Sequence, residues 1–180
     1  MRYFYKSNRL RILNVSWVLL LFTGVLFNAR IGLTAEFATS KEFRQYCGQC
    51  HGADGAGRGD AARYLYPKPR DFINGQLRLA TSSNMIATAD DIKQVLLTGV
   101  PNTSMQSWKQ LSDGLIDRLV IEIRQMQIQG ARQRVTLALL EDGLLVDGDG
   151  KLNLAGQQVV EDYTTQQTVP TGRWVAPAGL

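Results

Sequence analysis

The sequence predicts an all-α domain, and three segments of the chain carry this prediction. Each segment combines a residue that favours helix N-termini with apolar residues that recur at helical spacing. The three segments begin near Ser40, at Thr88 and at Ser112. They lie within a chain of 180 residues, which is long enough for one ordinary domain with further segments at both ends.

Residues 1–35 have the pattern of a secretory signal or of a membrane anchor. Four basic residues precede an apolar run from Ile12 to about Ala29, and the segment holds no acidic residue. The run is about 18 residues long, near the lower limit for crossing a bilayer. Either the leader is cleaved, for example after Ala35, or it stays as a single anchor. Both interpretations place residues 36–180 at the periplasmic or outer face of the cytoplasmic membrane, whereas a buried core helix would not explain the charged start.

The positive charge of the chain is concentrated in this leader. The whole sequence has 20 Lys and Arg residues against 16 Asp and Glu, a net charge of +4. Five of the basic residues lie within 1–35, so the rest of the chain is nearly neutral. A nucleic-acid partner would require a basic stripe on the folded domain, and none is evident. The composition therefore argues against nucleic-acid binding.

The first predicted helix begins at Thr39 or Ser40 and leads into an unusual motif. Thr39 and Glu42 have the spacing of a capping box, in which each side chain bonds to the other residue's backbone N–H. The helix continues through Phe43 and Tyr46 up to the segment 47–51. A glycine-rich loop, residues 52–59, follows that segment.

The motif contains both cysteines and the single histidine of the chain, in the order Cys47-Gly48-Gln49-Cys50-His51. The pattern C-x-x-C-H is typical of covalent haem attachment. Two thiols three positions apart on a helical turn can each bond one vinyl group of the same porphyrin. The adjacent histidine then lies beneath the iron as its proximal ligand. The motif predicts one covalently bound haem c.

Three other interpretations of the motif fit less well. A disulfide between Cys47 and Cys50 would close a very short loop and constrain little. A thioredoxin-like redox pair requires a βαβ context, and no strand pattern precedes Cys47. A zinc site would require a fourth ligand, and the chain has no further Cys or His.

Two further helices follow the motif. The second is predicted from Thr88, as its cap, to Gly99, with acidic residues in its first turn and an apolar face that includes Ile92 and Leu96. The third is predicted from Ser112 to Gly130. Its apolar residues recur at helical spacing: Leu115, Ile116, Leu119, Val120 and Ile123.

The tail, residues 131–180, exceeds an ordinary domain of this size. Residues 132–140 extend or follow the third helix. Residues 147–150 read as a hairpin turn between two short apolar stretches, since their spacing does not meet the calcium-loop pattern. Residues 166–172 look like a linker, and the last residues are apolar for a free end. Either the tail docks on a partner subunit, or the chain is a piece of a longer protein.

With this motif and these helices, residues 36–130 resemble the bacterial cytochrome c domain of the small, class-I-like type. The resemblance implies a cytochrome c fold wrapped around one haem, with His51 as proximal ligand and a methionine as distal ligand. In that family the first and last helices cross and pack. The resemblance therefore implies that Phe43 and Tyr46 meet the apolar residues of the third helix: Leu119, Val120 and Ile123.

The distal ligand is expected to be methionine, because the chain has no second histidine. The candidates are Met85, in a polar loop, Met105, between the second and third helices, and Met126, whose position favours core packing. The family commonly places its methionine where Met105 lies, with an aromatic residue three positions later, as Trp108 is here. The sequence departs from the commonest form because no proline flanks Met105, which would make an iron–sulfur bond easier to displace.

The resemblance also implies residues that support the site. In the family, a proline after the motif supplies the carbonyl that accepts the histidine's other ring proton, and Pro69 is favoured for this role over Pro67. Arg70 pairs either with a haem propionate or with the adjacent Asp71. Trp108 packs against the haem or supports the loop of Met105, or is an ordinary core aromatic.

These residues predict an electron carrier rather than an enzyme, acting alone or as a subunit of a respiratory-type complex with redox partner proteins. An alternative is a haem-based sensor or a peroxidase-like enzyme in which Met105 is labile or absent from the iron. A third interpretation is a docking module whose tail organises a larger complex. The state of the sixth iron position distinguishes the first two, and removal of residues 131–180 tests the third.

Overall fold

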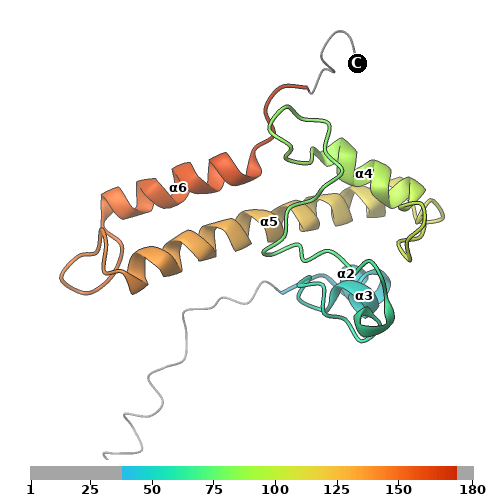
Figure 1. Cartoon of the computed structure of the whole chain (residues 1–180), viewed down its shortest axis with the longest axis horizontal. Helices are drawn as coiled ribbons and strands as arrows, with labels where there is room; N and C mark the ends of the chain where they lie inside the picture. Colours follow the sequence, from blue (N-terminus) through green and yellow to red (C-terminus); the bar gives the residue numbers. More distant parts are fainter. Residues whose placement is uncertain (1–37, 174–180) are drawn as a thin grey trace, which may run out of the picture. The chain divides into compact units, whose positions relative to one another are not determined.

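The computed structural model describes residues 38–173, and every regular element within this range is a helix. The elements in chain order are α2 (Lys41–Tyr46), α3 (Gly48–His51), the 3-10 helix η1 (Ala62–Tyr64), α4 (Ala89–Thr98), α5 (Asp113–Glu141) and α6 (Leu154–Thr168). Figure 1 labels the α-helices among them. The all-α prediction is confirmed. The leader predicted in residues 1–35 lies outside the described residues, as do residues 174–180.

A single cluster of buried apolar side chains joins the first helix to α4 and α5. It contains Phe43, Cys47, Phe72, Ala87, Ile92, Leu96, Ile116, Leu119, Val120, Ile123 and Met126. Tyr46 and Trp108 pack against it from the side. Phe43 and the apolar residues of α5 therefore belong to one core, whereas the direct contacts of Phe43 and Tyr46 with Leu119, Val120 and Ile123 stay a prediction.

The second predicted helix has the predicted ends. The Thr88 side chain accepts from the backbone N–H of Asp91, and the Asp91 carboxylate accepts from the N–H of Thr88, which completes a capping box. Gly99 ends α4 with a positive φ of 71°. Both ends are determined by residues within the helix and beside it, so the local sequence is sufficient to predict them.

The first predicted helix is capped by Ser40 rather than by Thr39. The Ser40 hydroxyl accepts from the backbone N–H of Phe43, whereas the Thr39 hydroxyl donates to the carbonyl of Ala53. The predicted capping box between Thr39 and Glu42 does not form. The carboxylate that accepts from the N–H of Ser40 belongs instead to Glu122 on α5, which is 82 residues away.

The third predicted helix does not end at Gly130, because α5 continues to Glu141. A Cβ atom at position 130 would overlap the carbonyl oxygen of Ile73. Gly130 therefore permits the loop at Ile73 to lie against the helix, and it is not a helix-ending residue. Of the two alternatives for residues 132–140, the extension of the third helix is the one observed.

The tail folds back on α5. Helix α6 packs along the C-terminal half of α5, as Figure 1 shows. The predicted hairpin is reduced to one antiparallel bridge, between Val146 and Leu152, on either side of a tight turn. The prediction of a linker at residues 166–172 is wrong for residues 166–168, because α6 runs to Thr168.

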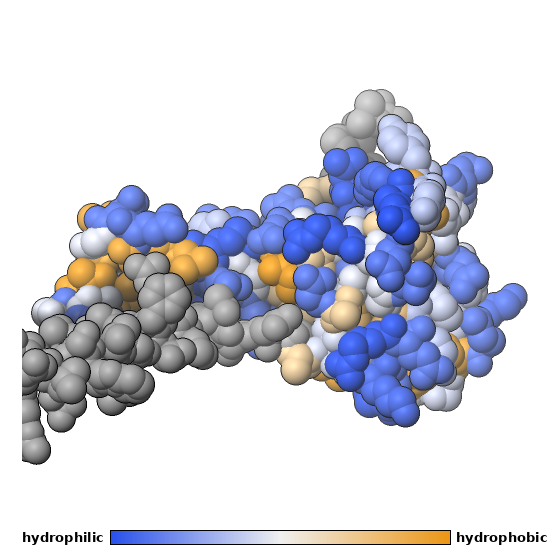
Figure 2. Space-filling view, turned by 90° about the horizontal axis from the view of Figure 1, so that it is seen from below, coloured by the Kyte–Doolittle hydropathy of each residue, from blue (hydrophilic) through white to orange (hydrophobic). Residues whose placement is uncertain are grey.

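The surface of the tail carries exposed apolar side chains near the α5–α6 connection. Leu144 and Leu154 are 53% and 84% exposed. Figure 2 shows hydrophobic surface at the end of the α5–α6 pair where this connection lies. Within residues 38–173, no helix combines the length and the apolar character needed to cross a membrane.

Candidate haem-attachment site

The motif lies on one tight turn between α2 and α3. Cys47 is the C-cap of α2 and immediately precedes α3. Its carbonyl accepts from the backbone N–H groups of Cys50, at 3.2 Å, and His51, at 2.9 Å. Both thiols are free, so the disulfide alternative is not formed. The three side chains predicted to attach and ligate a haem therefore come from a single helical turn.

The glycine-rich loop folds back on this turn. Gly57 donates its N–H to the carbonyl of His51 at 2.7 Å, and Gly59 donates to Cys50 at 3.1 Å. A Cβ atom at Gly59 would overlap the carbonyl oxygen of Gln49. The loop thereby satisfies the carbonyl groups that α3 leaves unpaired at its C-terminus.

His51 is buried and is oriented by two neighbours. Its Nδ1 donates to the carbonyl oxygen of Arg70 at 2.9 Å, and its ring stacks on Phe72 with centroids 4.5 Å apart. Burial lowers the pKa of His51, although the hydrogen bond to Arg70 opposes the shift. The imidazole is therefore neutral near pH 7, and Nε2 is the nitrogen left for a metal.

The carbonyl beside His51 comes from Arg70, which corrects the prediction for Pro69. The Pro69 carbonyl faces the glycine-rich loop instead, where a Cβ atom at Gly57 would approach it to 2.8 Å. Successive carbonyls of an extended segment point in different directions, so only one of the pair can face the imidazole. The predicted alternative Pro67 is not the acceptor either.

The side chain of Arg70 is exposed, and it does not pair with Asp71. The Asp71 carboxylate accepts from the backbone N–H groups of Ile73 and Asn74, each at 2.8 Å. None of the ion pairs within residues 38–173 includes Arg70. The local-pair alternative is therefore not observed, and the contact of Arg70 with a haem propionate stays a prediction.

Burial raises the pKa of the Cys47 thiol to about 12, and the charge of Glu122 and the neighbouring Cys50 add to this shift. The thiolate is the nucleophile in thiol–disulfide exchange, so a thiol of such high pKa is a poor redox nucleophile. This property disfavours the thioredoxin-like interpretation.

The loop that carries Met105 is anchored to α4. The Met105 carbonyl accepts from Val100 at 2.9 Å, and the N–H of Trp108 donates to Leu96 at 2.7 Å. The Ser107 hydroxyl donates to the carbonyl of Leu97 at 2.6 Å. These bonds restrain a loop in which no proline flanks the methionine. The Met105 side chain is half-buried and packs against the core cluster.

Trp108 links this loop to the motif. Its ring meets that of Tyr46 edge to face, with centroids 5.8 Å apart, and Tyr46 directly precedes Cys47. The structure thus brings Trp108, three residues after Met105, to the helix that enters the motif. This contact agrees with a role in supporting the loop.

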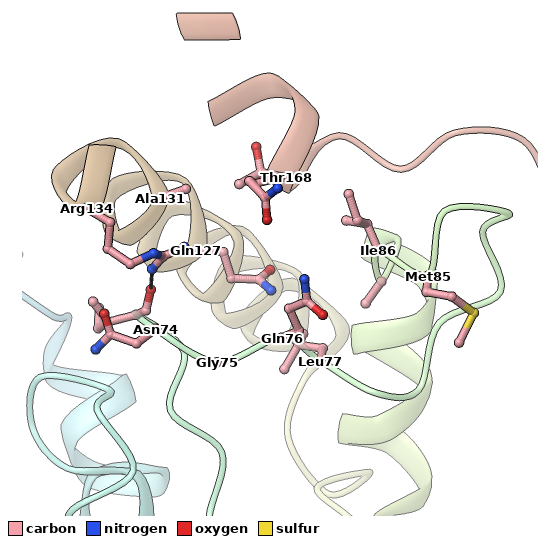
Figure 3. A pocket seen from close by; sticks show the side chains of 13 residues that line it. Asn74, Gly75, Gln76, Leu77, Met85, Ile86, Gln127, Ala131, Arg134 and Thr168 are labelled. Atoms are coloured by element: carbon pink, nitrogen blue, oxygen red, sulfur yellow. Dashed lines mark hydrogen bonds between the residues drawn. The ribbon is translucent and has the colours of Figure 1, made fainter. Parts of the chain in front are cut away.

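The other two methionines lie elsewhere. Met126 is fully buried in the core, as its position on a helix predicts. Met85 is 55% exposed and lines a pocket formed by α5, the end of α6 and the loop around residues 73–87. Figure 3 shows this pocket, whose lining includes Gln127 and Arg134 but no residue of the motif and not Met105.

The donor set fits one covalently bound haem c. Two free thiols, Cys47 and Cys50, share a turn with a neutral imidazole whose Nδ1 is already bonded. The remaining Nε2 of His51 is a usual axial ligand of haem iron, and the thioether of Met105 is a usual partner for it. Haem attachment and ligation by these four residues stay predictions at this point.

Sequence reasoning missed one residue of the site. Glu122 accepts two hydrogen bonds from Ser40, at the start of the helix that enters the motif. In the sequence, Glu122 stands between apolar residues of α5, and an acidic residue in an amphipathic helix is normally predicted to face the solvent. No local signal connects two residues that are 82 positions apart.

No family model matches the sequence, and no curated protein matches it. Among solved structures, the chain is similar to part of the reducing HAO-like protein complex of Kuenenia stuttgartiensis. The sequences are 30% identical, and the TM-score is 0.43. The match covers 53% of this chain and 43% of that chain, so it spans less than half of the neighbour's length.

Proposed function

We propose that this protein is a one-electron carrier with one haem c attached at Cys47 and Cys50. The observation that carries the proposal is the turn at residues 47–51, where both free thiols share one helical turn with a buried imidazole whose Nδ1 donates to the carbonyl of Arg70. When bound, haem c supplies one iron that cycles between Fe(II) and Fe(III).

The residues of the chain bind and orient in this proposal. Cys47 and Cys50 hold the cofactor covalently, and His51 offers Nε2 as proximal ligand. Met105 offers its sulfur as distal ligand, on a loop restrained by its bonds to α4. The apolar core excludes water around these groups, and no acid–base residue is required for electron transfer.

The decisive experiment is the absorption spectrum of the protein produced in a host that attaches haem c. We expect the ferric protein to show the long-wavelength sulfur-to-iron band. Met105→Ala should lose this band, because the iron would then have no sulfur ligand. The control Met85→Ala should keep it. Cys47→Ser with Cys50→Ser should yield a chain whose mass lacks the haem.

The opposite result would favour a different function. A wild-type protein that lacks the band and binds carbon monoxide when reduced has an open sixth position. That outcome would exclude Met105 as ligand, and the haem-based sensor or peroxidase-like enzyme would become the better account.

We also propose that residues 1–35 direct the domain to the outer face of the cytoplasmic membrane, where redox partner proteins meet it. This rests on the charged start and apolar run of the sequence. Fractionation of the producing cells and the mass of the mature chain test it together. Haem-containing protein confined to the cytoplasm would contradict it.

A further inference from the structure

Glu122 is an acidic residue within the core of the protein. Its residue surface is 8% exposed, and its neighbours Leu119, Val120 and Ile123 on α5 belong to the apolar cluster. Asp and Glu are rarely this buried unless they are paired. None of the ion pairs within residues 38–173 includes Glu122, so its partners must be hydrogen-bond donors.

Both carboxylate oxygens of Glu122 bond to Ser40. One accepts from the backbone N–H of Ser40 and the other from its hydroxyl, each at 2.6 Å. The Ser40 hydroxyl in turn accepts from the N–H of Phe43 at 2.9 Å. These bonds cap the N-terminus of α2, and Cys47 is the residue that follows the last residue of α2. Loss of the Glu122 carboxylate would therefore loosen the start of α2, and α2 is the only element between Ser40 and the motif.

The geometry points to Glu122 as a positioning residue that fixes α2, the helix leading into the motif, and lowers the haem reduction potential through its buried negative charge. This inference rests on the proposed electron-carrier function. A nearby negative charge stabilises ferric haem, which carries one more positive charge than ferrous haem. The effect is strong where burial limits screening by water and salt. Burial raises the pKa of the Cys47 thiol, and the negative charge of Glu122 adds to this shift.

The test compares midpoint potentials of holoproteins in a spectroelectrochemical titration. Glu122→Gln keeps the size of the side chain and one oxygen that can accept from Ser40, but it removes the charge. We expect its midpoint potential to shift upward. The matched control is Glu141→Gln, which removes the same charge from an exposed position on the same helix. Its potential should stay at the wild-type value.

The sign of the shift separates the charge effect from simple loosening of the structure. Loosening admits water, which stabilises the ferric form and lowers the potential. Ser40→Ala keeps the charge of Glu122 and removes the hydroxyl that caps α2. This variant should exchange the amide hydrogen of Phe43 faster than wild type, without an upward shift in potential.

A second variant removes the charge if Glu122→Gln yields too little protein. Glu122→Met fills a similar volume with an apolar, uncharged chain, and the same upward shift is expected. An unchanged or lowered potential in a Glu122 variant with intact haem overturns the inference. Failure of the wild-type protein to carry haem would instead overturn the proposed function, before any potential is measured.

Discussion

The part of the chain around the motif and the tail that follows it are held together in different ways. The buried cluster that joins α2, α4 and α5 consists of apolar side chains and ends at Met126. Helix α6 instead buries a stripe of mostly small residues, one in every four positions: Gly156, Val160, Thr164 and Thr168. The hydroxyls of Thr164 and Thr168 donate to carbonyls one turn earlier in the helix.

Polar bonds complete the attachment of the tail. The Arg124 guanidinium donates to the carbonyls of Ala87, at 3.1 Å, and Thr168, at 2.7 Å, and so connects α5 to both regions. The Asn84 side chain donates to Val169 at 3.0 Å. The comparison shows that apolar volume stabilises the motif region, whereas close approach and individual hydrogen bonds position the tail.

The largest effect is expected from a loss of volume in the motif region. Phe43→Ala removes a fully buried ring and should lower the free energy of unfolding by about 3–5 kcal/mol. Val160→Ala, in the tail, should cost about 1.5 kcal/mol, because it removes only two buried carbons. Urea denaturation of both variants measures the difference, and equal losses would contradict the comparison.

The next effect concerns close approach between α5 and the loop at Ile73. Gly130→Ala would place a methyl group on the carbonyl of Ile73, so we expect a loss of about 1–3 kcal/mol. Gly114→Ala is the control on the same helix, since its nearest neighbour is the flexible end of Arg118 at 3.8 Å. It should stabilise the protein by about 0.4–1 kcal/mol, because alanine lowers the conformational entropy of the unfolded chain. Thermal unfolding would show shifts of opposite sign, and parallel shifts would refute this role of Gly130.

A smaller effect is expected at the cap of α4. Thr88→Ala removes half of the capping box and should cost about 1 kcal/mol in urea denaturation. Desolvation opposes ionisation of Asp91, but hydrogen bonds from Thr81 and Thr88 hold its pKa below the ordinary value of 3.8. The carboxylate therefore stabilises the folded state above pH 3.8, and this contribution is lost as the pH falls through the lowered pKa.

Asp91→Asn should remove this part of the acid dependence. The free energy of unfolding of wild type and variant should be measured from about pH 2 to about pH 6. The two curves should converge at the acid end, where Asp91 is protonated in the wild type. Profiles that stay parallel throughout would show that Asp91 does not titrate as its contacts imply.

The smallest effect is expected from the ion pair between Arg132 and Glu161, which joins α5 to α6 at 2.5 Å. Both side chains are about half exposed, 49% and 57%, so Arg132→Gln should cost only about 0.2–1 kcal/mol. The loss should shrink in high salt. A larger, salt-independent loss in chemical denaturation would mean that the tail depends on this pair more than on its small-residue stripe.

Local signals predicted much of the fold. The ends of α4 follow from Thr88, Asp91 and Gly99, which act within the helix itself. The motif at residues 47–51 likewise forms the expected turn, because its geometry depends on neighbours in sequence. The core positions of α5 follow from helical spacing.

The errors occurred where distant segments decide the structure. Gly130 suggests the end of a helix, but a glycine is needed there because the carbonyl of Ile73 lies against the helix. The polar sequence at residues 166–168 resembles a linker, but small residues earlier in α6 allow it to pack on α5. The contact between Ser40 and Glu122 depends on how the chain closes, and neither residue signals it alone.

The contact at Gly130 also determines how far α5 can move along its own axis. A slide of one turn, about 5.4 Å, would bring Gln127 or Arg134, which share the face of Gly130, to the carbonyl of Ile73, and each carries a Cβ atom. Helix α5 therefore has one permitted register against this loop. The same helix carries Glu122 in its N-terminal half and the surface under α6 in its C-terminal half. The position of α6 on α5 is therefore fixed relative to the hydrogen bonds between Glu122 and Ser40 at the N-terminus of α2.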